Sequence, residues 1–167
     1  MILKNISKNF INNLILIISF FLLDRITKIY VIKLSEKNLG GDLFLSKFLN
    51  ISLIWNEGIA FGLFSFDKNY LYNFISLLIF ALILLVLFLS AKSEGIKKWS
   101  YLLIFSGGLG NLTDRIYYKG VPDFIDFHYQ NFHWFVFNVA DIFISIGIIY
   151  LLIDEIFLKN KNKNENI

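Results

Sequence analysis

The sequence predicts an all-α polytopic membrane protein, with four transmembrane helices and a small extracytoplasmic β-sheet between helices 1 and 2. The first reason is composition: 56% of the 167 residues are hydrophobic and only 17% are charged, too few polar side chains to cover a soluble fold of this size. The second is a set of four apolar segments, and the third is a long loop with a partly alternating pattern. We expect one domain spanning residues 1–167.

The four apolar segments predict helices at residues 10–34, 71–91, 101–116 and 138–158. A helix that crosses a bilayer needs about 20 predominantly apolar residues. The first segment reaches that length only if Asp24, Arg25 and Lys28 are included, whereas the second contains no charge. No small-residue cleavage pattern follows the first segment, so we expect a retained anchor. The polar tail, residues 159–167, is expected to be disordered.

The first loop, residues 35–69, is too long for a simple connection. Apolar and polar side chains alternate in part over residues 50–56, which favours strands over a fifth helix. We therefore expect a small sheet on the outer membrane surface, with an ordinary amphipathic loop as the alternative. The aromatic side chains of this loop would lie at the lipid interface, namely Phe44, Phe48, Trp55, Phe61, Phe64 and Phe66.

Lysines indicate the orientation in the membrane. They gather in the N-terminal segment, the second loop and the tail, as Lys4, Lys8, Lys92, Lys97, Lys98, Lys159, Lys161 and Lys163. Short loops rich in Lys and Arg stay in the cytoplasm. Both termini are therefore predicted to be cytoplasmic, and the first and third loops to face outward. The lysines form no basic stripe or recognition motif, so a nucleic-acid partner is not expected.

Four aspartates lie in or beside the third loop, where a charge near lipid is costly and therefore indicates function: Asp114, Asp123, Asp126 and Asp141. Residues three or four apart share a helix face. This spacing predicts polar faces on three helices, which should turn towards one another or towards water: Asp24 and Lys28; Asn111, Asp114 and Arg115; Asn138 and Asp141.

Ion pairs account for only part of these charges. Asp24 can pair with Lys28, and Asp114 with Arg115, as groups that stabilise helix ends. The third loop offers only Arg115 and Lys119 as cations, so there are fewer cations than carboxylates to pair with them. Asp123, Asp126 and Asp141 therefore need another reason to be present.

Two carboxylates that share a low-dielectric site cannot both ionise easily, so one keeps its proton. Such a pair holds a general acid and a general base at one pH and can activate water against a peptide bond. The same chemistry would serve a small proton-coupled membrane carrier, so the carboxylates alone leave hydrolysis and transport open.

A metal site is not predicted, and no cofactor is expected. The chain has no cysteine, and its histidines, His128 and His133, are five residues apart with no glutamate between them. The glycines of the third helix, Gly107, Gly108 and Gly110, favour close approach of a neighbouring helix.

Five blocks of the sequence resemble the lipoprotein signal peptidases, also called type II signal peptidases. Each block is weak alone, but all five occur in order: Asp24-Arg25-Ile26-Thr27-Lys28, Asn56-Glu57-Gly58-Ile59-Ala60-Phe61, Gly110-Asn111-Leu112-Thr113-Asp114-Arg115, Val121-Pro122-Asp123-Phe124 and Phe137-Asn138-Val139-Ala140-Asp141. They are similar to the family's Asp-x-x-x-Lys, Asn-x-Gly-x-Ala-Phe, Gly-Asn-x-x-Asp-Arg, Val-x-Asp-Phe and Phe-Asn-x-Ala-Asp.

The resemblance implies a membrane-embedded aspartic endopeptidase that cleaves prolipoproteins before the diacylglyceryl-modified cysteine. It implies that Asp123 and Asp141 are catalytic, and that the supporting or substrate-binding residues are Asp24, Lys28, Asn56, Gly58, Asn111, Asp114, Arg115, Asn138 and Ala140. It also implies a β-cradle on the outer face of the bacterial cytoplasmic (inner) membrane, with lipid-modified prolipoproteins and membrane lipid as partners. We expect a monomer, and Asp126 receives no role.

Overall fold

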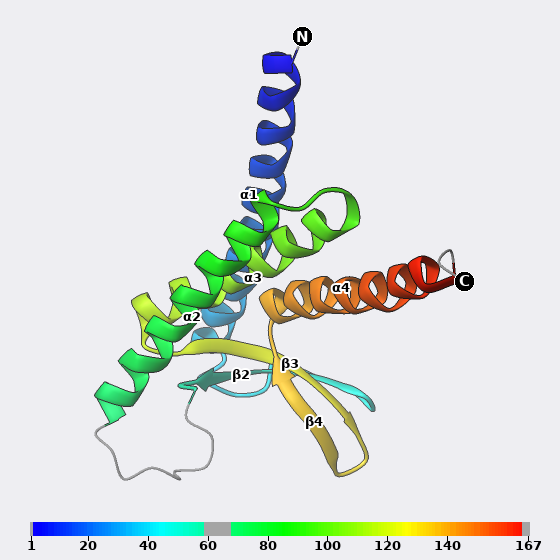
Figure 1. Ribbon diagram of the computed structural model, residues 1–167. Helices are drawn as coiled ribbons and strands as arrows, with labels where there is room; N and C mark the ends of the chain where they lie inside the picture. The colour runs from blue at the N-terminus through cyan, green and yellow to red at the C-terminus, as the bar shows by residue number, and fades with distance from the viewer. Residues whose placement is uncertain (1, 59–67, 165–167) are drawn as a thin grey trace.

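The computed structural model describes residues 2–58 and 68–164. Residues 1, 59–67 and 165–167 lie outside the description, and with them the predictions for Phe61, Phe64 and Phe66. The described residues form four helices and four strands in the order α1 (Ile2–Lys37), β1 (Phe44–Leu45), β2 (Leu49–Asn56), α2 (Lys68–Ala91), α3 (Gly95–Tyr118), β3 (Val121–Tyr129), β4 (Phe132–Phe137) and α4 (Val139–Asn164) (Figure 1).

The four predicted helices are present, and two of them, α1 and α3, extend beyond the predicted bounds at both ends. α1 continues to Lys37, and α3 begins six residues earlier than predicted, at Gly95. The disorder predicted for residues 159–167 is wrong for 159–164, because α4 continues to Asn164. Lysine is a good helix former, and extending an existing helix costs far less than nucleating a new one.

α3 is the central helix and packs against α1, α2 and α4. Glycines permit the closest of these contacts. A Cβ atom at Gly107 would lie 2.4 Å from the Ala140 carbonyl oxygen, and one at Gly147 would lie 2.7 Å from that of Ser100. Side chains at these positions would therefore push α4 away from α3, which confirms the prediction that small residues allow close helix approach.

The helices expose large apolar side chains on their outer surfaces, including Ile15, Leu77 and Ile149, each more than half exposed. Such surfaces are stable when lipid surrounds them and unfavourable in water. Among the described residues, one helical segment is long and apolar enough by itself to cross a membrane, Tyr72–Ala91.

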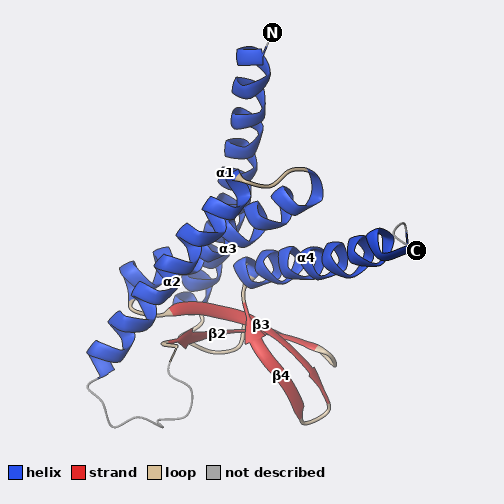
Figure 2. Ribbon diagram, viewed as in Figure 1, coloured by secondary structure: helices blue, strands red, loops and turns tan. Residues whose placement is uncertain are grey.

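The strands form one antiparallel sheet of order β1-β2-β3-β4, which lies at one end of the helices (Figures 1 and 2). The strands predicted in the first loop are confirmed as β1 and β2. The expectation that the sheet belongs to this loop alone is wrong, because β3 and β4 form a hairpin between α3 and α4. Residues 121–137 are rich in Phe and contain further aromatic and β-branched residues, which favour strands. β3 completes its hydrogen bonding by pairing with β2.

Candidate active site

Asp141 lies in the first turn of α4, where it takes part in the N-terminal cap of the helix. Asn138 precedes the helix, and its Oδ1 accepts a hydrogen bond from the Asp141 backbone N–H at 3.2 Å. In return, Asp141 Oδ2 accepts one from the Asn138 backbone N–H at 3.0 Å. This reciprocal arrangement is a capping box. It fixes the carboxylate at the start of a helix, where the helix dipole favours negative charge.

Asp123 reaches the same place from β3. Its Oδ1 accepts a hydrogen bond from Asn138 Nδ2 at 2.6 Å, and its Oδ2 accepts one from Asn56 Nδ2 at 2.9 Å. The second contact follows from the register of the sheet, in which Asp123 pairs with Ile54 and Asn56 with Val121. Asn138 therefore forms hydrogen bonds with both aspartates, and the two carboxylates lie on either side of it.

Burial raises the pKa of the Asp123 carboxyl above its ordinary value of 3.8, since only 4% of the residue is exposed. The hydrogen bonds from Asn138 and Asn56 lower this pKa because they stabilise the carboxylate. The charge of Asp141 raises it again, and that of Lys28 lowers it. Because burial is the largest effect, Asp123 is the member of the pair suited to hold a proton.

A buried ion cluster joins α1 to α3 behind this pair. Asp24 and Asp114 are fully buried, and both bind Arg25 and Lys28. Lys28 Nζ lies 3.0 Å from Asp24 Oδ1 and 2.7 Å from Asp114 Oδ2, while Arg25 Nη2 lies 2.7 Å from an oxygen of each aspartate. Two cations and two carboxylates make the cluster neutral. This balance allows it to remain buried.

Three hydrogen bonds connect the ion cluster to the start of α4. Lys28 Nζ donates to Asn111 Oδ1 at 2.7 Å, and Asn111 Nδ2 donates to Asp141 Oδ1 at 2.8 Å. The Ala140 backbone N–H donates to Asp24 Oδ1 at 3.1 Å. The position of Asp141 is therefore set from three helices, which confirms that the predicted polar faces turn towards one another.

Arg115 lies on another side of α3, towards Gly58 and α2. Its backbone carbonyl accepts a hydrogen bond from the Tyr72 hydroxyl at 2.8 Å. The residue is 8% exposed, and its Nε and Nη1 have no hydrogen-bond partner in the described part of the chain. Gly58 has φ +75°, and a Cβ there would lie 2.6 Å from Arg115 Nη1. Position 58 therefore needs glycine both for its backbone and for the space that the guanidinium occupies.

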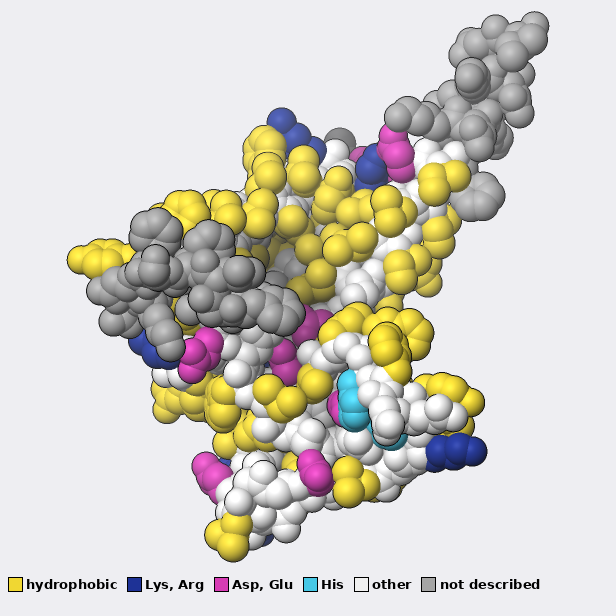
Figure 3. Space-filling model, turned by 90° about the horizontal axis from the view of Figure 1, so that it is seen from below, with side chains coloured by type: hydrophobic (Ala, Val, Ile, Leu, Met, Phe, Trp, Pro, Cys, Tyr) yellow, Lys and Arg dark blue, Asp and Glu magenta, His cyan; other side chains and the backbone are white. Residues whose placement is uncertain are grey.

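A cavity of about 420 Å³ opens beside Asp123 at the edge of the sheet. Its lining comes from β2, the residues after it, β3 and β4, as Ile54, Trp55, Asn56, Glu57, Gly58, Asp123 and Val136. Figure 3 views the molecule from the sheet end and shows acidic side chains near the centre of this face. The volume lies within the range of ligand and substrate pockets, roughly 300–1,000 Å³.

Comparison with known proteins identifies the family. The model of the family described as signal peptidase (SPase) II matches residues 16–157. The chain belongs to the signal peptidase II family. It is 50% identical over 158 residues to a lipoprotein signal peptidase of Pelagibacter ubique, a match covering 95% of each chain. It is 40% identical over 142 residues to that of Clostridium tetani, covering 84% of this chain and 89% of the relative.

Solved structures of bacterial membrane enzymes share the fold. One superposes with a TM-score of 0.69 at 28% identity, covering 85% of this chain and 90% of the other. Another has a TM-score of 0.67 at 25% identity, covering 91% and 90%. Membership of the signal peptidase II family confirms the resemblance found in the sequence. Of the two activities that the carboxylates left open, it identifies hydrolysis and not transport. The chain is a bacterial membrane enzyme, an aspartic peptidase with lipoprotein signal peptidase activity.

Arg25 belongs to the buried ion cluster, although helical spacing did not single it out. It follows Asp24 directly, so it points about 100° away around the helix. Its long side chain nevertheless turns back to bind Asp24 and Asp114 and donates to the Gly110 carbonyl at 3.2 Å. The predicted Asp114–Arg115 ion pair is wrong, because Arg25 and Lys28 of α1 take that place. One feature of the sequence indicated that a cation from elsewhere pairs with Asp114, namely that the third loop has fewer cations than carboxylates.

Asp126 does not join the pair, because residues three apart in a strand point to opposite faces. Its Oδ2 lies 2.8 Å from His133 Nδ1, and the His128 and His133 rings stack at 5.0 Å. Figure 3 shows the histidine side chains, in cyan, beside an acidic side chain on the sheet-end face. Within the described ranges, no group of three or more His, Cys, Asp or Glu side chains could hold a metal ion.

Proposed function

We propose that Asp123 and Asp141 are the catalytic dyad of the signal peptidase activity. The observation that carries this proposal is that Asn138 hydrogen-bonds both carboxylates, one buried on a strand and one at a helix start. The cavity beside Asp123 gives a substrate access to the pair. Substitution of each aspartate tests the proposal, with the outcome argued in the Discussion.

The two environments favour different roles in peptide hydrolysis. Asp123, with its raised pKa, begins protonated and donates its proton to the carbonyl oxygen of the scissile bond. Asp141 takes a proton from water, whose oxygen attacks the carbonyl carbon to give a tetrahedral intermediate. Asp141 then protonates the amide nitrogen as the C–N bond breaks, and Asp123 recovers a proton from a hydroxyl group of the intermediate. The pair ends in its starting protonation state.

The membrane placement that we propose has four spanning helices and both termini in the cytoplasm of the inner membrane. Two features support it. The dyad and the sheet lie at one end of the helices, and the lysines of residues 92–98 lie at the other. A diacylglyceryl-modified prolipoprotein keeps its acyl chains in the bilayer while the bond before its cysteine reaches the outer surface. The dyad at the outward helix ends suits this substrate.

Arg115 is proposed to bind a backbone carbonyl of the prolipoprotein rather than to act in the chemistry. Its buried N–H groups lack partners in the described part of the chain, and Gly58 beside it lines the cavity. Arg115→Gln is expected to raise KM about tenfold or more, since a charged hydrogen bond contributes roughly 1.5–3 kcal/mol. Gly58→Ala should act in the same direction because its Cβ displaces the guanidinium.

Steady-state cleavage of a lipidated precursor measures this effect. Gly120→Ala is the matched control, because a Cβ there would make only an ordinary contact at 3.6 Å with Trp55. Unchanged KM in both Arg115→Gln and Gly58→Ala would remove Arg115 from substrate binding.

The pH dependence of kcat/KM should report the proton on Asp123. Activity is expected to fall as pH rises through the Asp123 pKa, which lies above that of an ordinary aspartate. Asn56→Leu removes a hydrogen bond that lowers this pKa, so the pKa rises further and the alkaline limb moves to higher pH. Asn50→Leu is the control on the same strand, because Asn50 faces Asp126 instead. A shift to lower pH in Asn56→Leu, or equal profiles for both variants, contradicts the assignment.

A further inference from the structure

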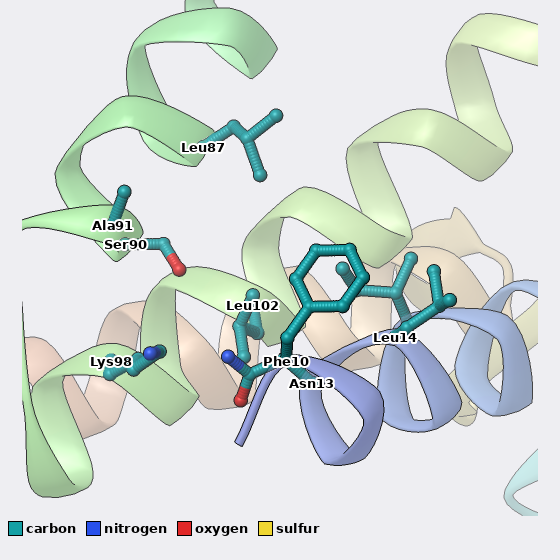
Figure 4. A pocket seen from close by; sticks show the side chains of 9 residues that line it. Phe10, Asn13, Leu14, Leu87, Ser90, Ala91, Lys98 and Leu102 are labelled. Atoms are coloured by element: carbon teal, nitrogen blue, oxygen red, sulfur yellow. The ribbon is translucent and has the colours of Figure 1, made fainter. Parts of the chain in front are cut away.

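An apolar cavity of about 450 Å³ lies between α1, α2 and α3, at the end of the helices away from the sheet (Figure 4). Leu14 and Ile17 of α1, Leu87 of α2 and Leu102 of α3 line it. Lys98 lies 16 residues before Asp114 on α3, so about 24 Å of helix separates this cavity from the ion cluster. The cavity is therefore not part of the catalytic site.

Polar groups gather at one end of this cavity. Ser90 is 2% exposed and lines the cavity. Figure 4 shows the Ser90 hydroxyl and the Lys98 side chain on the cavity wall, near the Asn13 side chain. Asn13 and Lys98 also line a neighbouring polar cavity of about 400 Å³, together with Asn12, Glu94, Gly95 and Trp99. An apolar space thus leads directly into a polar one.

Lys98 is the one charged residue among those that line the apolar cavity, whereas the Glu94 carboxylate lines only the neighbouring polar cavity. α3 begins at Gly95 with no acidic residue in its first turn, and the Glu94 side chain makes no capping hydrogen bond. The backbone N–H groups of this turn and the helix dipole therefore add to the charge of Lys98. Lys97 is paired with Asp154 at 3.8 Å, and Lys92 lies over the Phe88 ring at 4.3 Å. Among the described residues, Lys98 has no carboxylate within ion-pair distance.

We propose that this groove binds one anionic phospholipid. An acyl chain would occupy the apolar cavity, and the headgroup phosphate would lie against Lys98, the Ser90 hydroxyl and the start of α3. Basic pockets between membrane helices recognise anionic lipid headgroups in this way. The charge disfavours the signal peptide itself as occupant, because the basic n-region of a signal peptide would meet Lys98. The inference rests on the proposed membrane placement but not on the catalytic dyad.

Native mass spectrometry of the full-length protein, released from detergent with added lipid, tests this proposal. Phosphatidylglycerol is expected to bind more tightly than phosphatidylcholine with the same acyl chains. Lys98→Gln should weaken phosphatidylglycerol binding about fivefold, since each basic residue near an anionic headgroup contributes about 1 kcal/mol. Lys92→Gln removes the same charge from the loop before α3, outside the cavity, and should leave binding unchanged.

Leu14→Trp supplies an independent test, because the larger side chain fills the apolar cavity and should lower retention of both lipids. Equal binding of the two lipids, or equal effects of Lys98→Gln and Lys92→Gln, would overturn the proposal. So would a Leu14→Trp variant that raises KM for the precursor and keeps phosphatidylglycerol, since the cavity would then hold the signal peptide. Lipid binding does not depend on catalytic activity, so the result for the aspartate variants described in the Discussion does not affect this measurement. Either proposal can therefore fail without the other.

Discussion

Asp123→Asn and Asp141→Asn are each expected to lower kcat by about 10⁴-fold or more, the scale seen when one member of a catalytic group that acts as a unit is removed. Asparagine keeps the size of the side chain and can still accept a hydrogen bond from Asn138 or Asn111. It can neither take a proton from water nor supply one to the scissile carbonyl. Each variant should therefore fold and bind the precursor but fail to cleave it.

Cleavage of a diacylglyceryl-modified precursor by purified enzyme measures this loss, with thermal unfolding as the check on folding. Asp126→Asn is the matched control, because Asp126 is a buried aspartate on the same strand that faces away from Asp141. It should keep near-normal turnover. Near-normal turnover by either dyad variant sinks the assignment, as does an equal loss in a folded Asp126→Asn protein.

Contacts within one helix or across a cap could be predicted from the sequence. Spacing of four residues placed Asp24 with Lys28, which lie 3.0 Å apart, and spacing of three placed Asn138 with Asp141. These contacts depend only on local geometry, which is the same in every α-helix. The strand β2 followed from the alternation over residues 50–56.

Contacts between distant segments could not be predicted by spacing. Pairing of Asp114 with Arg25 joins residues 89 positions apart, and it depends on how α1 crosses α3. Separation of Asp126 from Asp123 depends on β3 being a strand, whereas the segment had been assigned to a loop. Once the strand is known, the separation follows, because successive residues point to opposite faces and Asp123 and Asp126 are an odd number of residues apart. Asn56 was identified as a site residue only through the resemblance to the family motifs. Spacing could not identify it, because its contact with Asp123 depends on the pairing of β2 with β3.

Substitution within the buried ion cluster is expected to have the largest effect on stability. Asp114→Asn is expected to lower the free energy of unfolding by about 3–5 kcal/mol, the cost of removing one partner from a buried ion pair. The substitution leaves Arg25 and Lys28 with Asp24 as their one carboxylate in the cluster, so a net positive charge is buried. Asp154→Asn is the control, because its partner Lys97 is partly exposed at 3.8 Å and such pairs contribute less than about 1 kcal/mol.

Lys28→Met combined with Asp114→Asn distinguishes the contribution of charge balance to stability from that of side-chain packing. The double substitution restores neutrality by leaving Arg25 with Asp24, so the protein should be more stable than with Asp114→Asn alone, although it carries one change more. Reversible unfolding in mixed detergent micelles gives the four free energies, those of the unsubstituted protein, of Asp114→Asn and Lys28→Met alone, and of the double variant. If the double variant is less stable by the sum of the two single losses, the charges do not interact, and the cluster supports the dyad through packing instead of charge balance.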